Sequence, residues 1–497
     1  MNHLSFIICW TPVFLLIIGA VFFKRPALDL SIMGLIFTFG LVAVFFKTPI
    51  DTVLFAGLDG VITTLPFILV IFTGIMLSTL MMHTGSLVRI VEWLMNGVKT
   101  AFHSILLISV GMGNLMEGMC VIAEPVVAPM LYAAGVSASG AAVLSILGYS
   151  GLLTLEFAGM IIEVLSNVTG ISVESLGMPI GWLSFVSIIF LSAFIPYFLP
   201  KEKNYLKKLP VVFLCASIAG LTALLTVKYI GISISGITAG IVVILFLLLT
   251  GPKKLRINRQ ILRDISPFII LFLCLLFVNI IPFLKEITRN RLIFNIGIIP
   301  VHSIKLTPFF SAYTYLVISF IAACLILKIT FAGLKKAIKD GLSKAWRPSL
   351  SMAFFGAMGQ IITFSGYSGG FGTCENSGNI PWLLANGLFL YTGSLYPLFV
   401  PFLGWVGTFL TGYGIASLML FGKLQAQAAG IMGVSAVWLS SGLAVGASIG
   451  SISSPFKIAI ATPMCNATGQ EGKILRITIP LGIGVSFLLG IILMFII

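Results

Sequence analysis

Residues 135–138 read Gly-Val-Ser-Ala, and residues 433–436 read Gly-Val-Ser-Ala again, 298 positions later (433 against 135). Each stretch leads through a long apolar run to a similar ending, Asn-Val-Thr-Gly at 167–170 and Asn-Ala-Thr-Gly at 466–469. One long unit is therefore present twice in this chain. A duplication of this size is the sequence signature of a repeat architecture.

The segments just upstream of the two stretches also align. Residues 111–118 read GMGNLMEG and residues 404–412 read GWVGTFLTG, with one residue inserted. In an apolar chain, an internal duplication of this kind is typical of a secondary transporter whose substrate site lies where the repeats meet.

The composition is that of a membrane protein. Hydrophobic residues make up 59% of 497 positions and charged residues 9%, and the mean hydropathy is +1.14. The net charge of +14 comes from basic residues in short loops between apolar runs, so we expect the lipid bilayer as partner and no nucleic acid. The seven cysteines are scattered singly and indicate neither a disulfide framework nor a metal site.

The chain predicts an all-α polytopic protein with about twelve transmembrane helices, because apolar runs long enough to cross the bilayer recur along its whole length. Two further segments, 101–134 and 400–432, are interrupted at Glu117-Gly118 and Thr411-Gly412, and we expect each to form a re-entrant hairpin. The expected spans are residues 4–23, 28–46, 61–82, 138–165, 182–199, 210–229, 232–250, 266–284, 310–329, 348–366, 435–465 and 477–497.

Loop charge orients the chain. Most of the 29 Lys and Arg residues fall in loops that are inside if the N-terminus is outside. The acidic segment 50–63 then precedes the first copy from outside, whereas the basic segment 331–348, expected to lie along the inner membrane interface, precedes the second from inside. The copies are therefore expected to be inverted repeats.

The expected organisation has three parts. Residues 1–200 form the N-terminal repeat with a broken helix at 138–165, and residues 201–284 form connecting helices. Residues 285–497 form the inverted C-terminal repeat with a broken helix at 435–465.

Each broken helix is expected to open at mid-membrane. Ser454 followed by Pro455 is typical of a helix start, so a half-helix with free N–H groups should begin there and attract a carboxylate. In the first copy, residues 148–151 read Gly-Tyr-Ser-Gly and allow the backbone to open. The alternative is that these are close-packing or kink positions only. The candidate substrate-binding residues are Gly118, Tyr149, Ser150, Gly151, Thr411, Gly412, Tyr413, Ser453, Ser454 and Lys457.

Charged residues inside the predicted membrane segments need a partner, a proton or water. Glu117, Glu156 and Glu124 are the candidates for carrying a coupling proton, since loss of water favours the neutral form of a carboxyl. Lys457 falls near the third position of the half-helix, where the helix dipole disfavours a cation. We expect it to pair with Glu156 or to contact a substrate carboxylate, and the alternative is that it reaches an aqueous cavity.

Several of these motifs resemble those of the lactate permease family. They are residues 404–412, the stretch LQAQAA at 424–429 with Gly433-Val434-Ser435, Ser454-Pro455 with Ile458-Ala459-Ile460-Ala461, and in the first copy Glu117-Gly118 with Pro125-Val126. The resemblance implies a proton-coupled symporter of lactate or glycolate with paired hairpins and an elevator-type motion.

The chain also departs from the family pattern. After Thr411-Gly412 the family usually has serine, aspartate and threonine, where Tyr413, Gly414 and Ile415 stand here. After Ser454-Pro455 it usually has glutamine and serine, where Phe456 and Lys457 stand here, and an asparagine-threonine pair is replaced by Tyr149 and Ser150. The expectation is that the fold is kept and that the substrate can differ.

Other classes of function fit less well. No HExxH, nucleophile elbow or P-loop indicates an enzyme, no cofactor or metal is expected, and His3, His83, His103 and His302 lie far apart as interfacial or loop residues. A channel is compatible with polar breaks, but inverted broken helices favour alternating access. The main rival is a sodium- or proton-coupled carrier of another organic ion, such as a dicarboxylate, an amino acid or an amine. We expect a plasma membrane location and a possible homodimer.

Overall fold

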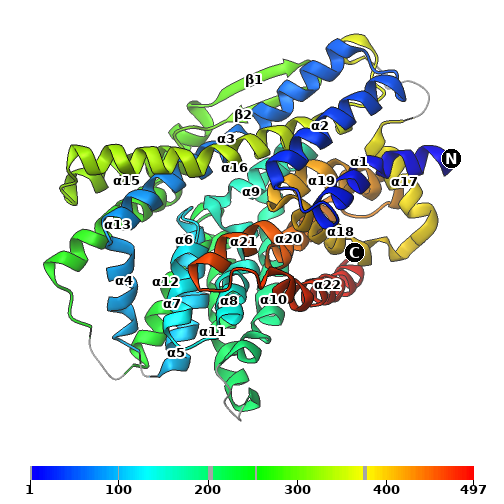
Figure 1. Ribbon diagram of the computed structural model, residues 1–497. Helices are drawn as coiled ribbons and strands as arrows, with labels where there is room; N and C mark the ends of the chain where they lie inside the picture. The colour runs from blue at the N-terminus through cyan, green and yellow to red at the C-terminus, as the bar shows by residue number, and fades with distance from the viewer. Residues whose placement is uncertain (1–2, 99, 200–204, 252–254, 373–377) are drawn as a thin grey trace.

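The computed structural model describes residues 3–98, 100–199, 205–251, 255–372 and 378–497. Within these residues the chain is nearly all helical (Figure 1). Eleven of the described helices are long and apolar enough to cross a membrane, which confirms a polytopic helical membrane protein. The expected boundary between residues 200 and 201 lies outside the described residues.

The set of long helices differs from the expected spans in two ways. Three expected spans are not among the eleven: residues 138–165 and 310–329 hold only shorter helices, and residues 348–366 largely belong to the longer helix Phe331–Thr363. In addition, Ile380–Thr411 and Gly414–Met432 are both long enough to span. The stretch before residue 400 was missed because the asparagine, prolines and glycines within it weaken its apolar pattern.

The first half of the chain forms twelve α-helices among its described residues, with a six-residue π-helical segment, η1 (Leu107–Met112), between the fifth and sixth. They are α1 (His3–Val21), α2 (Ala27–Val44), α3 (Ile50–His83), α4 (Ser86–Met95), α5 (Ala101–Leu106), α6 (Gly113–Gly118), α7 (Glu124–Ala133), α8 (Ala138–Ser150), α9 (Met160–Thr169), α10 (Val173–Ser192), α11 (Tyr205–Tyr229) and α12 (Ser235–Leu249).

The second half adds ten α-helices and one pair of strands among its described residues. They are α13 (Arg259–Ile280), α14 (Pro282–Glu286), β1 (Phe294–Ile299), β2 (His302–Leu306), α15 (Ala312–Ile326), α16 (Phe331–Thr363), α17 (Ile380–Thr392), α18 (Tyr396–Thr411), α19 (Gly414–Met432), α20 (Ala436–Gly450), α21 (Pro455–Met464) and α22 (Glu471–Ile496).

The two longest helices, α3 and α16, pack along one another across the molecule (Figure 1). A Cβ atom added at Gly60 of α3 would lie 2.1 Å from the carbonyl oxygen of Gly356 of α16, so only glycine lets the backbones approach this closely. Two expectations are corrected here. Residues 50–60, which lie outside the expected span 61–82, are part of the same helix as that span, and residues 331–348 continue through Pro348 into the same helix as the expected span 348–366.

The strands correct the all-α expectation. β1 and β2 form an antiparallel hairpin in which Phe294 pairs with Leu306 and Ile296 with Ile304, and Figure 1 shows it lying along α3. Residues 294–299 read Phe-Asn-Ile-Gly-Ile-Ile, and the three β-branched isoleucines favour a strand. The segment is short, so no strand was expected there.

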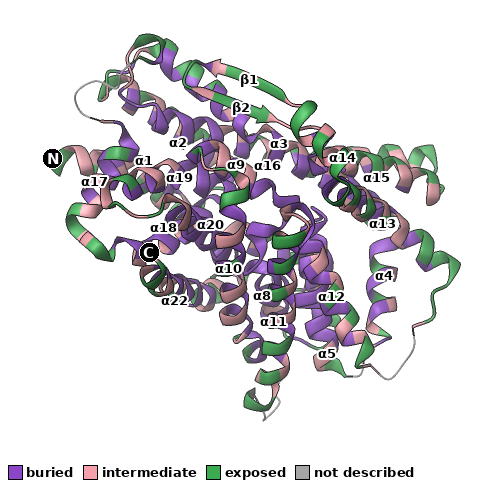
Figure 2. Cartoon of the chain, turned by 180° about the vertical axis from the view of Figure 1, so that it is seen from behind, coloured by how far each residue is buried: buried purple, intermediate pink, exposed green. Residues whose placement is uncertain are grey.

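The centre of the molecule is formed by helices that are buried on every side. Residues 140–150 of α8 are all buried, as are residues 439–450 of α20, and Figure 2 shows these helices enclosed by the outer ones. Outer helices such as α13, α15 and α22 expose large apolar side chains, which is the pattern expected where lipid replaces water. Helices α8 and α20 therefore lie in the protein core and not against lipid.

Candidate functional site

The two interrupted helices meet at the core of the molecule. α8 ends at Ser150, and nine residues follow in short turns, including Leu153–Leu155 and Phe157–Gly159, before α9 begins at Met160. α20 ends at Gly450, a turn covers Ser451–Ser453, and α21 begins at Pro455. The two breaks pack together, because α8 contacts both α21 and the turn at Ser451–Ser453.

Hydrogen bonds join the two interrupted segments at this point. The Ser448 hydroxyl donates to the carbonyl of Ser150 at 2.5 Å, and the Thr154 hydroxyl donates to the carbonyl of Ala444 at 3.1 Å. All four residues are buried. The carbonyl of Ser150, at the end of α8, thus has a partner in a side chain of α20, and irregular backbone at membrane depth requires such partners.

The half-helix α21 starts with a local signal that the sequence carries. Ser454 is its N-cap, its side chain accepts from the backbone N–H of Lys457 at 3.4 Å, and Pro455 occupies the first helical position. Lys457 is therefore at the third position of the helix, where the dipole opposes its charge.

Lys457 is held by the first copy. Its Nζ donates to the hydroxyl of Tyr149 at 2.7 Å, lies 4.6 Å from the centre of the Tyr149 ring and stands 3.6 Å from Glu124 Oε1. The Tyr149 hydroxyl in turn donates to Glu124 Oε1 at 2.5 Å. These contacts form a buried chain of lysine, tyrosine and carboxylate that links α21, α8 and α7.

The expected pairing of Lys457 with Glu156 is wrong in this structure. Glu156 lies within the break, in extended backbone conformation, and neither of its carboxylate oxygens has a hydrogen-bond partner among the described residues. The prediction assumed that Glu156 continues the helix of α8. Because α8 ends at Ser150, Glu156 does not lie opposite Lys457. Glu156 still lies within electrostatic reach of Lys457 and of Glu117.

Glu117 completes a group of three buried carboxyls. Its Oε1 accepts from the backbone N–H of Ala123 at 2.8 Å, across the turn between α6 and α7, and its Oε2 has no partner among the described residues. Glu124 Oε2 is also without a partner there. Buried polar atoms that lack a partner mark a place where a proton, water or ligand can be held.

The tip of the second hairpin approaches the same region. Gly412 ends α18 in the left-handed conformation (φ 83°), which favours glycine, and the Tyr413 ring packs on Phe456 with ring centres 4.9 Å apart. The Tyr413 hydroxyl is buried without a partner among the described residues and lies within electrostatic reach of Glu124. The Thr411 hydroxyl instead donates to the carbonyl of Gly407 at 2.7 Å.

Three of the remaining candidates have structural contacts of their own. Gly118 packs against the backbone of Gly236 and Ile237 on α12. The Ser453 hydroxyl donates to the Thr478 carbonyl at 2.7 Å. Gly151 packs against Ile188 of α10. Their roles in substrate binding stay predictions.

The structure adds Asn114, which sequence reasoning missed. Its Nδ2 donates to the carbonyl of Val110 at 2.6 Å and to that of Gly148 at 3.2 Å, and its buried Oδ1 has no partner among the described residues. An asparagine within the apolar run 101–118 was the available signal. Asn114 therefore ties the first hairpin to the end of α8.

The chain matches the family model described as L-lactate permease over residues 5–497. It is 27% identical to the glycolate permease of Escherichia coli (strain K12), over 91% of this chain and 88% of that protein. It is 24% identical to an L-lactate permease of Salmonella typhimurium, over 98% of this chain and 95% of that protein, and 23% identical to one of Streptococcus iniae, over 86% and 92%. With a match that runs across nearly its whole length, the chain belongs to the L-lactate permease family.

Proposed function

We propose that this protein is a secondary transporter that carries a small monocarboxylate, such as lactate or glycolate, together with a proton across the plasma membrane. Family membership and the names of the relatives support the substrate class. The observation that carries the proposal is the amino group of Lys457, a largely buried cation beside buried oxygen atoms that lack hydrogen-bond partners among the described residues.

The substrate carboxylate binds to Lys457 at the start of α21. The first N–H groups of a helix attract an anion, and Lys457 adds a full positive charge to that end. Lactate and glycolate also carry a hydroxyl beside the carboxylate. Phe456 is next to Lys457 on α21, and the Tyr413 ring packs on Phe456. The Tyr413 hydroxyl, which has no partner among the described residues, can therefore bond that group.

Coupling to a proton follows from charge balance. Without substrate, Lys457 is balanced by Glu124 through Tyr149. When the substrate carboxylate replaces Glu124 as the partner of Lys457, the charge of the Glu124 carboxylate in the core is no longer balanced. Such a buried charge is costly unless a proton neutralises Glu124. One proton then accompanies each carboxylate. Glu117 and Glu156 are further places for that proton, because each keeps at least one oxygen without a partner in the described structure.

Within this proposal the two halves are inverted repeats that work by an elevator-type motion, and the order of elements supports the repeats. α3, the hairpin of α5 to α7 and the interrupted pair α8 and α9 come in the same order as α16, the hairpin of α18 and α19 and the interrupted pair α20 and α21. In this proposal α3 and α16 belong to a fixed scaffold, and the hairpins move with the interrupted helices. An outward N-terminus and a homodimer stay predictions.

The test is uptake of labelled lactate and glycolate into proteoliposomes. An inward proton gradient without sodium is expected to drive accumulation of both, whereas a sodium gradient at equal pH is not. A dicarboxylate and an amine serve as comparison solutes. Uptake that depends strictly on sodium, or uptake of the amine alone, contradicts the proposal.

A further inference from the structure

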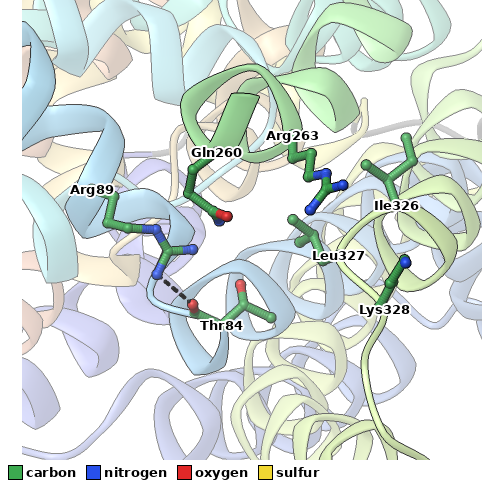
Figure 3. A pocket seen from close by; sticks show the side chains of 7 residues that line it. All are labelled: Thr84, Arg89, Gln260, Arg263, Ile326, Leu327 and Lys328. Atoms are coloured by element: carbon green, nitrogen blue, oxygen red, sulfur yellow. Dashed lines mark hydrogen bonds between the residues drawn. The ribbon is translucent and has the colours of Figure 1, made fainter. Parts of the chain in front are cut away.

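A polar pocket lies away from the central site, where α3 and α15 end and α4 and α13 begin. It has a volume of 280 Å³ and lies between the end of α3 and α4, the start of α13 and the end of α15. Figure 3 shows that three cationic side chains come to it from these separate elements. The lining residues are Thr84, Arg89, Gln260, Arg263, Ile326, Leu327 and Lys328.

One wall of the pocket is fixed by an ion pair between the buried Asp264 and the partly exposed Arg89. Arg89 donates from Nε to Asp264 Oδ2 and from Nη2 to Asp264 Oδ1, both at 2.7 Å, and from Nη1 to the Thr84 carbonyl at 2.9 Å. Asp264 also accepts from Ser86 at 2.7 Å and from Gln260 at 3.1 Å. The hydrogen bond from Arg89 holds both partners in their charged forms, and it raises the pKa of Arg89.

The other wall carries two positive charges, those of Arg263 and Lys328, that no acidic side chain in the described structure balances. Asp264 is already saturated by Arg89, Ser86 and Gln260, and no carboxylate or other acceptor among the described residues bonds the guanidinium of Arg263 or the amino group of Lys328. Figure 3 shows these two side chains on the same side of the pocket, facing Gln260 and Arg89 across it. The pocket therefore offers two unbalanced cations to one ligand.

The surroundings point to a lipid as the source of that ligand. Leu262, next to Arg263, is 55% exposed, and Leu325, three residues before Lys328, is 73% exposed. The exposed apolar faces of α13 and α15 continue from there, with Leu273 and Ile321 among their exposed side chains. An acyl chain can lie along these faces while its head group occupies the pocket.

We propose that this pocket binds the phosphate group of an anionic phospholipid. Paired cations between transmembrane helices are a known way to hold such head groups, and a guanidinium matches the geometry of a phosphate. Given the orientation expected from loop charge, the pocket faces the inner leaflet. The bound lipid bridges α13, α15 and, through Arg89, the end of α3. This site is separate from Lys457 and does not depend on which solute is transported.

The experiment uses the purified full-length protein and native mass spectrometry with phosphatidylglycerol or phosphatidylcholine. Wild type is expected to retain one phosphatidylglycerol under conditions that remove phosphatidylcholine. The double variant Arg263→Gln with Lys328→Gln is expected to bind it roughly 25-fold more weakly, since each cation near an anionic lipid contributes about a factor of five. The matched control is Arg256→Gln with Arg259→Gln, which removes the same amount of charge at the start of α13, close to Arg263, without changing the pocket lining.

Three results overturn the proposal. One is equal retention of both lipids by wild type, and another is equal loss of phosphatidylglycerol in the pocket variant and the control. The third is displacement of the lipid by millimolar inorganic phosphate, which assigns the pocket to a free anion. If the double variant does not fold, Arg263→Lys serves instead. It keeps the charge but not the planar fork, and it is expected to bind more weakly than wild type and more tightly than Arg263→Gln.

Discussion

Ser448 donates a hydrogen bond to the carbonyl of Ser150 at 2.5 Å, and the two residues are 298 positions apart, the same spacing that separates the two Gly-Val-Ser-Ala stretches. Equivalent positions of two copies can touch only near the axis that relates the copies. The breaks of α8 and α20 therefore meet at the centre of the proposed repeat pair, and the cluster around Lys457 lies beside that point.

Removing this contact is expected to destabilise the fold. Ser448→Ala deletes a buried donor and leaves the Ser150 carbonyl without it, at a cost of about 1 kcal/mol in the free energy of unfolding. Ser441→Ala is the control on the same helix, because the Ser441 hydroxyl bonds only the Val437 carbonyl of its own helix. Thermal unfolding of the two purified variants makes the comparison, and a larger loss in Ser441→Ala argues against a role for the contact between copies.

Lys457 is expected to be required for binding the carboxylate. Lys457→Gln removes the cation and should lower lactate uptake roughly ten- to hundredfold, since hydrogen bonds to charged groups contribute about 1.5–3 kcal/mol. Lys423→Gln is the matched control, because Lys423 also lies within a long apolar helix but away from the cluster. Initial uptake rates in proteoliposomes are the measurement. Equal rates for the two variants would remove Lys457 from the site.

Glu124 is expected to link the proton to the substrate. Glu124→Gln keeps the acceptor oxygen for Tyr149 but cannot take up a proton. Accumulation driven by a proton gradient should be lost, whereas exchange of labelled for unlabelled lactate at equal pH should continue. Glu163→Gln is the control, because Glu163 lies on α9 beyond the break. If Glu124→Gln still accumulates lactate, the coupling proton is carried elsewhere, with Glu117 and Glu156 next in line.

The β-hairpin is expected to be held by a charge that depends on pH. His302 Nδ1 lies 2.7 Å from Asp59 Oδ2 on α3, and Nε2 lies 3.0 Å from the Asn167 carbonyl at the end of α9. Burial lowers the pKa of His302, but the hydrogen bond and charge of Asp59, with the Asn167 carbonyl, outweigh it and raise the pKa above 6.5, against a smaller opposing effect of Lys423.

The sign follows from that raised pKa. Stability from protonated His302 is fully present below pH 6.5, its ordinary pKa, and is lost as the pH rises through the higher value in the folded protein. The unfolding temperature of wild type should therefore fall between mildly acidic and alkaline pH by more than that of His302→Gln. Identical pH profiles for the two proteins would show that the contact contributes nothing.

The contact between α3 and α16 is expected to leave no room for a side chain at Gly60. Gly60→Ala places a Cβ atom 2.1 Å from the Gly356 carbonyl oxygen, which is backbone and cannot move alone. The expected cost is at least about 1–3 kcal/mol in unfolding free energy. Gly57→Ala, one turn earlier, meets Ile361 at 3.4 Å and should cost less. Unfolding temperatures that rank the other way contradict this packing.

Local signals made part of the site predictable. Ser454 with Pro455 marked the start of a half-helix, and Gly412 marked the end of another helix, because a cap depends on a few adjacent residues. Lys457 stood out for the same reason, as a cation at a helix start. Its partner was not predictable in this way, since the turn between Ser150 and Met160 displaces Glu156 from the helical register that the repeat spacing assumes.

Two features of the fold were not predictable because they depend on contacts between residues far apart in the sequence. Asp59 lies just before the expected span 61–82, but in the structure His302, 243 positions away, and Gln360, 301 positions away, reach its carboxylate. With those partners α3 continues through Asp59. The strand pair next to α3 was not predicted for the same reason. It packs on α3, and neighbouring residues in the sequence do not indicate this contact.

The length of α3 has a consequence for the surrounding lipid. A helix of 34 residues is about 51 Å long, whereas the hydrocarbon layer is about 30 Å thick. α3 must incline steeply or project beyond that layer, and α16 shares its inclination because the two backbones touch at Gly60 and Gly356. A change in acyl-chain length should therefore change the tilt of α3 and α16 together. The thickness of the membrane thus influences the conformation of the protein through this helix pair.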